Sequence, residues 1–125
     1  MSNSSHAGEP ELYCIELRTA QWENMVVWYR QALGLRSLFR VVDDGYALLA
    51  AGATRLALIA SRDAGPATPR YSLAIEVPNL EEAEARLRAS GTHDDPPRYN
   101  PEGYDELVTV DPDGNTVRIF SWPSP

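Results

Sequence analysis

The sequence contains two copies of one strand-and-helix pattern, and this repeat restricts the fold more than any other feature. In the first half, the alternating segment LYCIELR at residues 12–18 precedes a helical segment that stops at Gly34. In the second half, the alternating segment YSLAIEV at residues 71–77 precedes a helical segment that stops at Gly91. The two glycines lie 57 positions apart, the spacing expected if one supersecondary unit was duplicated. We therefore expect two similar halves.

The first half continues from its helix into three further strands. In the helical segment 19–34, Thr19 is available as the N-cap, and apolar side chains recur at helical intervals at Trp22, Met25, Val26, Tyr29 and Leu33. We expect a helix of about three turns with these residues in the core. Segments 35–42, 46–52 and 55–60 have strand character, and the Asp-Asp-Gly sequence at 43–45 is a good hairpin connection. The predicted order is βαβββ.

The second half repeats this order less sharply. Asn79 and Glu82 form a capping box before the helical segment 80–90. Residues 92–103 are too rich in proline and glycine to hold a long strand, but strands at 106–110 and 116–120 flank the hairpin-type turn DPDGN. The sequence thus predicts an α+β fold of two tandem βαβββ modules, 12–60 and 70–122, joined by a linker at 61–70 and preceded by a flexible tail at 1–11.

Composition and charge exclude several classes of function. The net charge of −7, with no basic cluster, has the wrong sign for attracting nucleic acid. No apolar run is long enough for a bilayer, and the first ten residues lack the pattern of a signal peptide. The lone Cys14 forms no internal disulfide, which is consistent with a reducing compartment. We therefore expect a cytoplasmic protein with neither nucleic acid nor membrane as a partner.

Three segments resemble the vicinal oxygen chelate superfamily, which includes glyoxalase I, extradiol dioxygenases and bleomycin-resistance proteins. They are WYRQALGLR at 28–36, AIEVPNLEEAEARLRASG at 74–91 and DPDGNTVRIF at 111–120. Their order and spacing extend the resemblance over roughly residues 12–122. It implies two βαβββ modules whose mixed sheets curl around a cavity, with the helices outside. It also implies a homodimer, since one short chain closes the exposed sheet edges poorly.

The resemblance further implies where a metal would bind. In the metal-dependent members, the first strand of each module supplies His or Gln and the last strand supplies Glu or His. The corresponding positions here hold Cys14, Ala57, Ser72 and Arg118. A protonated arginine has no lone pair to offer and alanine has no donor, so the three or four ligands of a metal site are missing. We therefore expect no metal and no cofactor, and we expect His6 and His93 to be solvated surface residues.

The strand positions that face the implied cavity carry charges instead. Because side chains alternate along a strand, the predicted ligand-binding residues are Cys14, Glu16, Arg18, Ser72, Glu76, Arg118 and Phe120. In one interpretation the two arginines bind a carboxylate, phosphate or enolate-like oxygen, while Glu16 or Glu76 orients the ligand or moves a proton. In the other, these charges pair with one another or face solvent. Aromatic residues near strand ends are candidates for stacking on a ligand: Tyr46, Tyr104 and Trp122.

Two functions follow from this reading. The first is a metal-independent protein of the glyoxalase and bleomycin-resistance type that binds and sequesters an unidentified small molecule. The alternative is a lyase, isomerase or dioxygenase-like enzyme of the same superfamily that acts on a small oxygenated substrate, with glutamate and arginine in place of the metal. The missing metal ligands favour the first, since in these enzymes the cation stabilises the developing oxyanion.

Overall fold

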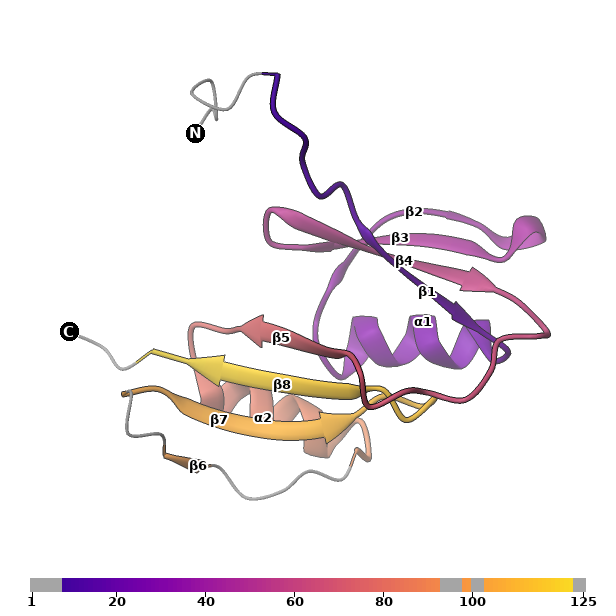
Figure 1. The fold of residues 1–125 in the computed structure, drawn as a ribbon. Helices are drawn as coiled ribbons and strands as arrows, with labels where there is room; N and C mark the ends of the chain where they lie inside the picture. The colour runs from indigo at the N-terminus through magenta and orange to yellow at the C-terminus, as the bar shows by residue number, and fades with distance from the viewer. Residues whose placement is uncertain (1–7, 93–97, 100–102, 123–125) are drawn as a thin grey trace.

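The computed structural model describes residues 8–92, 98–99 and 103–122, which form two four-stranded mixed sheets with one helix each (Figure 1). In the first half, the elements are β1 (Ile15–Thr19), α1 (Trp22–Gln31), β2 (Arg36–Val41), the 3₁₀ turn Val42–Asp44, β3 (Tyr46–Ala51) and β4 (Thr54–Ala60). The strand order is β1-β4-β3-β2, with β1 parallel to β4 and the other pairs antiparallel.

The second half has the same topology. Its elements are β5 (Ser72–Glu76), α2 (Leu80–Ala89), the two-residue β6 (Arg98–Tyr99), β7 (Asp105–Val110) and β8 (Thr116–Ser121). The order β5-β8-β7-β6 repeats that of the first sheet, and β5 is again parallel to its neighbour β8. The predicted α+β fold of two βαβββ modules is confirmed. The two sheets stay separate, so β1 and β5 are both edge strands.

The hydrophobic core lies on the helix side of each sheet. In the second module, Leu107, Val117 and Ile119 alternate along their strands toward α2 and are fully buried. In the first module, five of the ten residues of α1 are buried, because the helix lies between its own sheet and the second module (Figure 1). The face of each sheet opposite its helix is hereafter the open face. No helix in the described part of the chain is long and apolar enough to cross a bilayer.

The helix boundaries in the structure agree with one predicted N-cap and differ from the other. Asn79 caps α2 as predicted, since its Oδ1 accepts a hydrogen bond from the backbone N of Glu82 at 3.0 Å. Thr19, predicted to cap α1, is the last residue of β1, which begins at Ile15 rather than residue 12. The N-cap of α1 is Gln21, whose own backbone N donates to Thr19 Oγ1 at 3.0 Å. The threonine therefore holds the turn that enters the helix.

Gly34 and Gly91, the predicted helix stops, both adopt a left-handed backbone with φ of +76° and +79°. Gly34 also lies against the other module. A Cβ atom at this position would come within 2.7 Å of Nη1 of Arg86 on α2. Glycine is therefore favoured at residue 34 by its left-handed backbone, whereas the flexible end of the Arg86 side chain has room to move aside.

A buried hydrogen bond joins the two modules. The Tyr29 hydroxyl on α1 donates to Asp111 Oδ2 at 2.7 Å. Asp111, only 3% exposed, begins the DPDGN turn, and its Oδ1 accepts from the backbone N of Asp113 and of Asn115 at 2.9 Å each. Burial and the adjacent Asp111 carboxylate raise the pKa of Tyr29 far above its usual value, so the phenol keeps its proton as a donor. The same turn also binds Gln21, whose Nε2 donates to Pro112 O at 2.9 Å and to Asp113 Oδ1 at 2.7 Å.

Replacement of Tyr29 by phenylalanine tests this junction. Tyr29→Phe removes one of the hydrogen bonds to a buried carboxylate, so we expect a loss of about 1.5 to 3 kcal/mol in the free energy of unfolding. Urea denaturation followed by tryptophan fluorescence measures it. The control is Tyr71→Phe, at an exposed tyrosine, which should be neutral. Equal stability of the two variants would contradict a joining role for the bond.

Candidate functional site

Arg118 lies in the middle of β8 on the open face of the second sheet. Its neighbours Val117 and Ile119 point into the core, so alternation directs the arginine to the opposite side. Its Nε and Nη2 atoms both lie 2.6 Å from Oε1 of Glu106 on β7. The hydrogen bond and the charge of Glu106 raise the pKa of Arg118. Glu106 is only 8% exposed. The arginine thus gives a largely buried carboxylate a charged partner and fixes its position.

Glu106 is a candidate site residue that the sequence pattern does not single out. That pattern groups Arg118 with Arg18, Glu16 and Glu76 on the cavity side of the strands. The structure instead pairs Arg18 with Glu16 on the first sheet, at 3.5 Å and with both side chains exposed. The hairpin around the DPDGN turn is the signal that could have revealed the pairing of Arg118 with Glu106. Its register sets Glu106 opposite Phe120 and Val108 opposite Arg118, so Glu106 and Arg118 are diagonal neighbours on the same face of the sheet. Among the described residues, the ion-pair partner of Arg118 is therefore Glu106, while Glu76 lies opposite Phe120 on the other side of β8 and stays a predicted site residue.

Three aromatic rings form a cluster beside this ion pair, hereafter the aromatic cluster. The ring centroid of Tyr104 lies 5.7 Å from that of Phe120 and 5.3 Å from that of Trp122, and the Phe120 and Trp122 centroids are 6.1 Å apart. All three contacts are edge-to-face, which is a favourable ring geometry. Trp122 is 54% exposed. The cluster therefore offers ring surface to a ligand at the end of β8.

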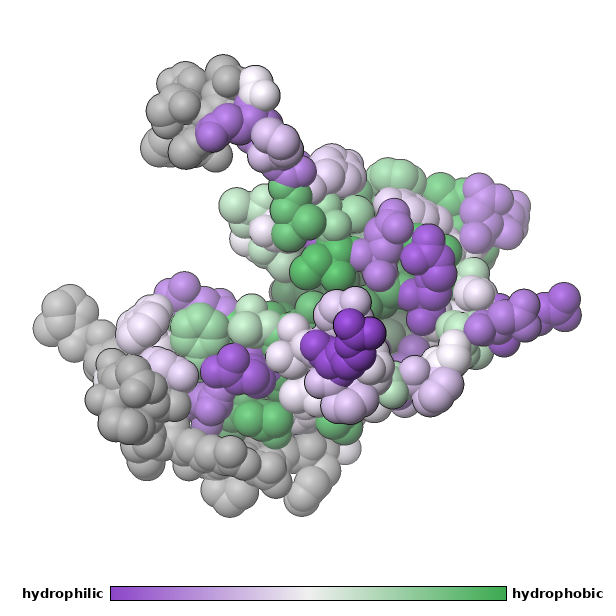
Figure 2. All heavy atoms as spheres, viewed as in Figure 1, coloured by the Kyte–Doolittle hydropathy of each residue, from purple (hydrophilic) through white to green (hydrophobic). Residues whose placement is uncertain are grey.

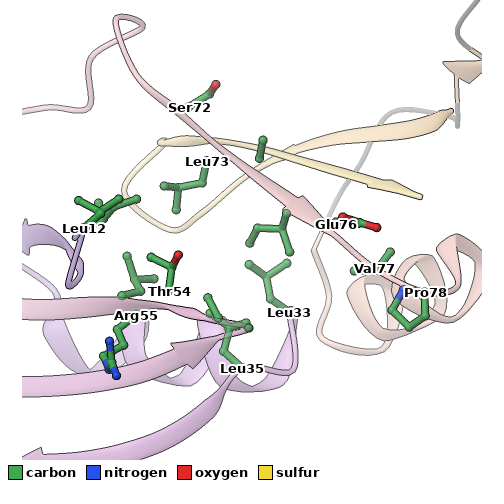
Figure 3. Close-up of a pocket in the computed structure, with 16 residues that line it drawn as sticks. Leu12, Leu33, Leu35, Thr54, Arg55, Ser72, Leu73, Glu76, Val77 and Pro78 are labelled. Carbon is green, nitrogen blue, oxygen red and sulfur yellow. The ribbon is translucent and has the colours of Figure 1, made fainter. Parts of the chain in front are cut away.

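A pocket of about 710 Å³ lies between the two modules, beside the edge strand β5 (Figure 3). Its wall is mainly aliphatic, and Leu33, Leu35 and Leu73 point into it. Figure 2 shows hydrophobic residues along the notch between the two halves of the molecule. The volume is in the range of sites that enclose small organic molecules.

Two of the predicted ligand-binding residues, Ser72 and Glu76, line this pocket. Their strand β5 pairs with β8 in a register that sets Ala74 beside Arg118 and Glu76 beside Phe120. Partners in such a ladder share a face of the sheet. The open face of the second sheet therefore carries Ser72, Glu76, Arg118 and Phe120 together, next to the pocket.

The other three predicted residues, Cys14, Glu16 and Arg18, belong to the first sheet or the segment just before it. Cys14 is a half-buried free cysteine. Burial raises the pKa of the Tyr46 phenol, and the proximity of Cys14 adds to the rise. Tyr46, a predicted stacking residue, packs against Phe39 with ring centroids 5.6 Å apart. No residue of this group lines the pocket.

The side chains at the family's metal positions do not fit a divalent cation. Arg118 carries a positive charge and its Nε and Nη2 are committed to Glu106. Ala57 is buried on β4 and has no donor atom. Within the described ranges, no three His, Cys, Asp or Glu side chains gather as a metal site would require. His6 and His93 lie outside the described residues.

Comparison with known proteins now assigns the family. The family model described as a glyoxalase-like domain matches residues 14–120. The chain belongs to the glyoxalase-like family. The predicted membership of the vicinal oxygen chelate superfamily is thereby confirmed. A search of curated proteins gave no match.

Solved structures similar to this glyoxalase-like chain include a glyoxalase/bleomycin resistance protein/dioxygenase from Nocardioides. It is 25% identical, with a TM-score of 0.69, and the match covers 92% of this chain and 85% of that one. Lactoylglutathione lyase from Agrobacterium tumefaciens is 16% identical, with a TM-score of 0.70 and coverage of 91% and 95%. The fosfomycin resistance protein FosX from Listeria monocytogenes is 12% identical, with a TM-score of 0.75 and coverage of 91% and 96%. The last two likenesses concern the fold.

The Arg118–Glu106 pair yields a stability prediction. Arg118→Met leaves Glu106 without its cation, and because water still reaches the site we expect a loss of about 1 to 3 kcal/mol in the free energy of unfolding. Arg18→Met, which breaks the exposed pair with Glu16, should cost less than about 1 kcal/mol. Urea denaturation of both variants measures the difference.

A double variant tests whether the unpaired Glu106 carboxylate causes the loss of stability. In Arg118→Met/Glu106→Gln the buried charge is gone, so part of the lost stability should return. If the double variant were no more stable than Arg118→Met, the unpaired carboxylate would not be the cause.

Proposed function

We propose that this glyoxalase-like protein binds a small organic molecule in the pocket beside β5. The observation that supports the proposal most directly is the pocket itself, a 710 Å³ space with a mainly aliphatic wall and a few polar groups at its border. Small-molecule sites combine such a wall, which supplies most of the affinity, with a few polar groups that fix orientation. Ser72 and Glu76 are such groups here.

The binding we propose needs no metal. The affinity comes from apolar surface removed from water, at about 25 cal/mol for each Å². The residues at the family's metal positions, Arg118 and Ala57 among them, supply no site for a cation. A protein of this kind sequesters its ligand, and the cytoplasmic location expected from the sequence remains part of the proposal.

An enzyme is the second candidate, and Glu106 is the observation that favours it. A carboxylate can accept a proton as a general base, and Arg118 fixes this largely buried one in position on the open face. Its substrate would be a small oxygenated molecule lying against the aromatic cluster. Turnover lost in Glu106→Gln while ligand binding persists would support the enzyme. Binding with no turnover would support sequestration.

A homodimer completes the proposal. The first sheet exposes a group of apolar side chains at and after β2, at Leu38, Phe39, Val41 and Val42. Exposed apolar groups of this kind mark contact surfaces. We assign them to a second copy of the chain, in agreement with the pairing expected from the superfamily.

The pocket is tested by filling it. Leu73 on β5 points into the pocket, so Leu73→Trp should occupy the ligand volume. A compound that raises the melting temperature of the native protein in a thermal-shift screen should lose at least about tenfold in affinity for this variant, as measured by calorimetry. Ala85→Trp, at an exposed position on α2, is the matched control and should bind normally. Dialysis against a chelator should leave native binding unchanged.

The dimer is tested at Phe39. Light scattering of the native protein should give twice the 13.8 kDa mass of one chain. Phe39→Lys places a charge in the apolar surface and should shift the mass toward the monomer. Val27→Lys, at an exposed valine on α1, should leave the dimer intact. A monomeric native protein at micromolar concentration would contradict the proposal.

A further inference from the structure

Phe120 stands between two glutamates on the open face of the second sheet. It is paired with Glu76 on β5 and with Glu106 on β7. Directly paired residues share a face, and neighbouring strands lie about 4.8 Å apart. The sheet therefore brings two carboxylates to either side of one aromatic ring, at the border of the pocket.

Among the described residues, one of these carboxylates has an ion-pair partner. Arg118 directs Nε and Nη2 to the same oxygen of Glu106. The side chain of Glu76 is exposed and makes neither a hydrogen bond nor an ion pair within the part of the chain described. The negative charge that remains for a ligand is thus that of Glu76, which also lines the pocket.

Arg55, the cationic residue among those that line the pocket, is already in contact with Tyr13. The guanidinium carbon of Arg55 lies 4.5 Å from the centroid of the Tyr13 ring, and its Nη1 donates to the Tyr13 carbonyl at 3.3 Å. An anionic ligand would have to compete with this contact. A cationic ligand would find Glu76 without a competitor.

The aromatic cluster adds a second attraction for a cation. Ring faces carry negative potential, and an ammonium group within about 6 Å of a ring centroid is stabilised by it. Phe120 is the ring beside Glu76, and Trp122, in contact with Phe120, is more than half exposed at 54%. Carboxylate and ring surface therefore lie side by side on the open face, and the carboxylate residue Glu76 also lines the aliphatic pocket.

We propose that the ligand is an organic cation, an alkylammonium compound whose aliphatic part fills the pocket and whose charged group lies between Glu76 and the aromatic cluster. This inference rests on the proposed binding function and specifies its ligand class. The net charge of −7 adds long-range attraction for such a cation.

Three probes of equal chain length test the charge preference by isothermal titration calorimetry of the full chain at low salt. They are hexyltrimethylammonium, 1-hexanol and 1-hexanesulfonate. We expect the cation to bind about tenfold more tightly than the other two, from one exposed charge contact and one ring contact. Glu76→Gln should lower the affinity for the cation about fivefold and leave the affinity for the alcohol unchanged. Trp122→Leu should lower the affinity for the cation alone. Glu81→Gln, at an exposed glutamate on α2, should leave the affinity for all three probes unchanged.

The outcomes separate this inference from the pocket function. Equal binding of all three probes, or unchanged cation affinity in Glu76→Gln, overturns the cation preference and leaves the pocket function in place. Tighter binding of the sulfonate overturns it in favour of Arg118. If no probe binds while binding of a neutral compound from the screen is lost in Leu73→Trp, the cation inference fails and the pocket function stands. If nothing binds at all, both fail.

Discussion

The hydrogen bond between Tyr29 and Asp111 is the interaction on which the arrangement of the two modules depends. Each module has its own sheet and helix, and among the described residues no strand ladder connects the two sheets. The relative position of the modules is therefore set by side chains, and the Tyr29–Asp111 bond between them is buried. The carboxylate also shapes its own turn through two backbone N–H groups, so one residue organises the loop and docks it. The shape of the pocket between the modules therefore depends on this junction.

Arg118 shows how a shared fold carries different chemistry. In the superfamily, a metal ligand is expected at this strand position, and a cation would then draw oxygen atoms toward it. Here a guanidinium group occupies the strand and draws Glu106 to it. The positive charge is retained, but it is covalently fixed and already paired. In the binding that we propose, selectivity then depends on groups around the pair, namely Glu76 and the exposed ring of Trp122.

The sequence predicts local structure well and side-chain partners poorly. The repeat, the helix stops at Gly34 and Gly91 and the Asn79 cap depend on neighbouring residues, and a pattern records them directly. The pairing of Arg118 with Glu106 depends on the register across a hairpin, where a shift of one residue reverses every side chain. The pocket could not be predicted at all, because its walls come from both halves and its size depends on their docking.

Errors at the start of α1 have the same origin. Thr19 has the chemistry of an N-cap, and it does bind a backbone N–H in this turn. It does so from the last position of β1, because pairing with β4 extends the strand to that residue. The extended strand moves the helix start by two residues, an effect of the sheet that helix signals do not contain.

The contact between Gly34 and Arg86 shows how a duplicated unit loses its symmetry. Arg86 lies 57 positions after Tyr29, so the two residues occupy the same place in the two copies of the repeat. One became a buried phenol that holds a turn, and the other a cation that covers a glycine of the opposite module. Two identical copies would present like surfaces to one another. Divergence at this single helical position gave the copies different roles, so the order of the halves along the chain is no longer interchangeable.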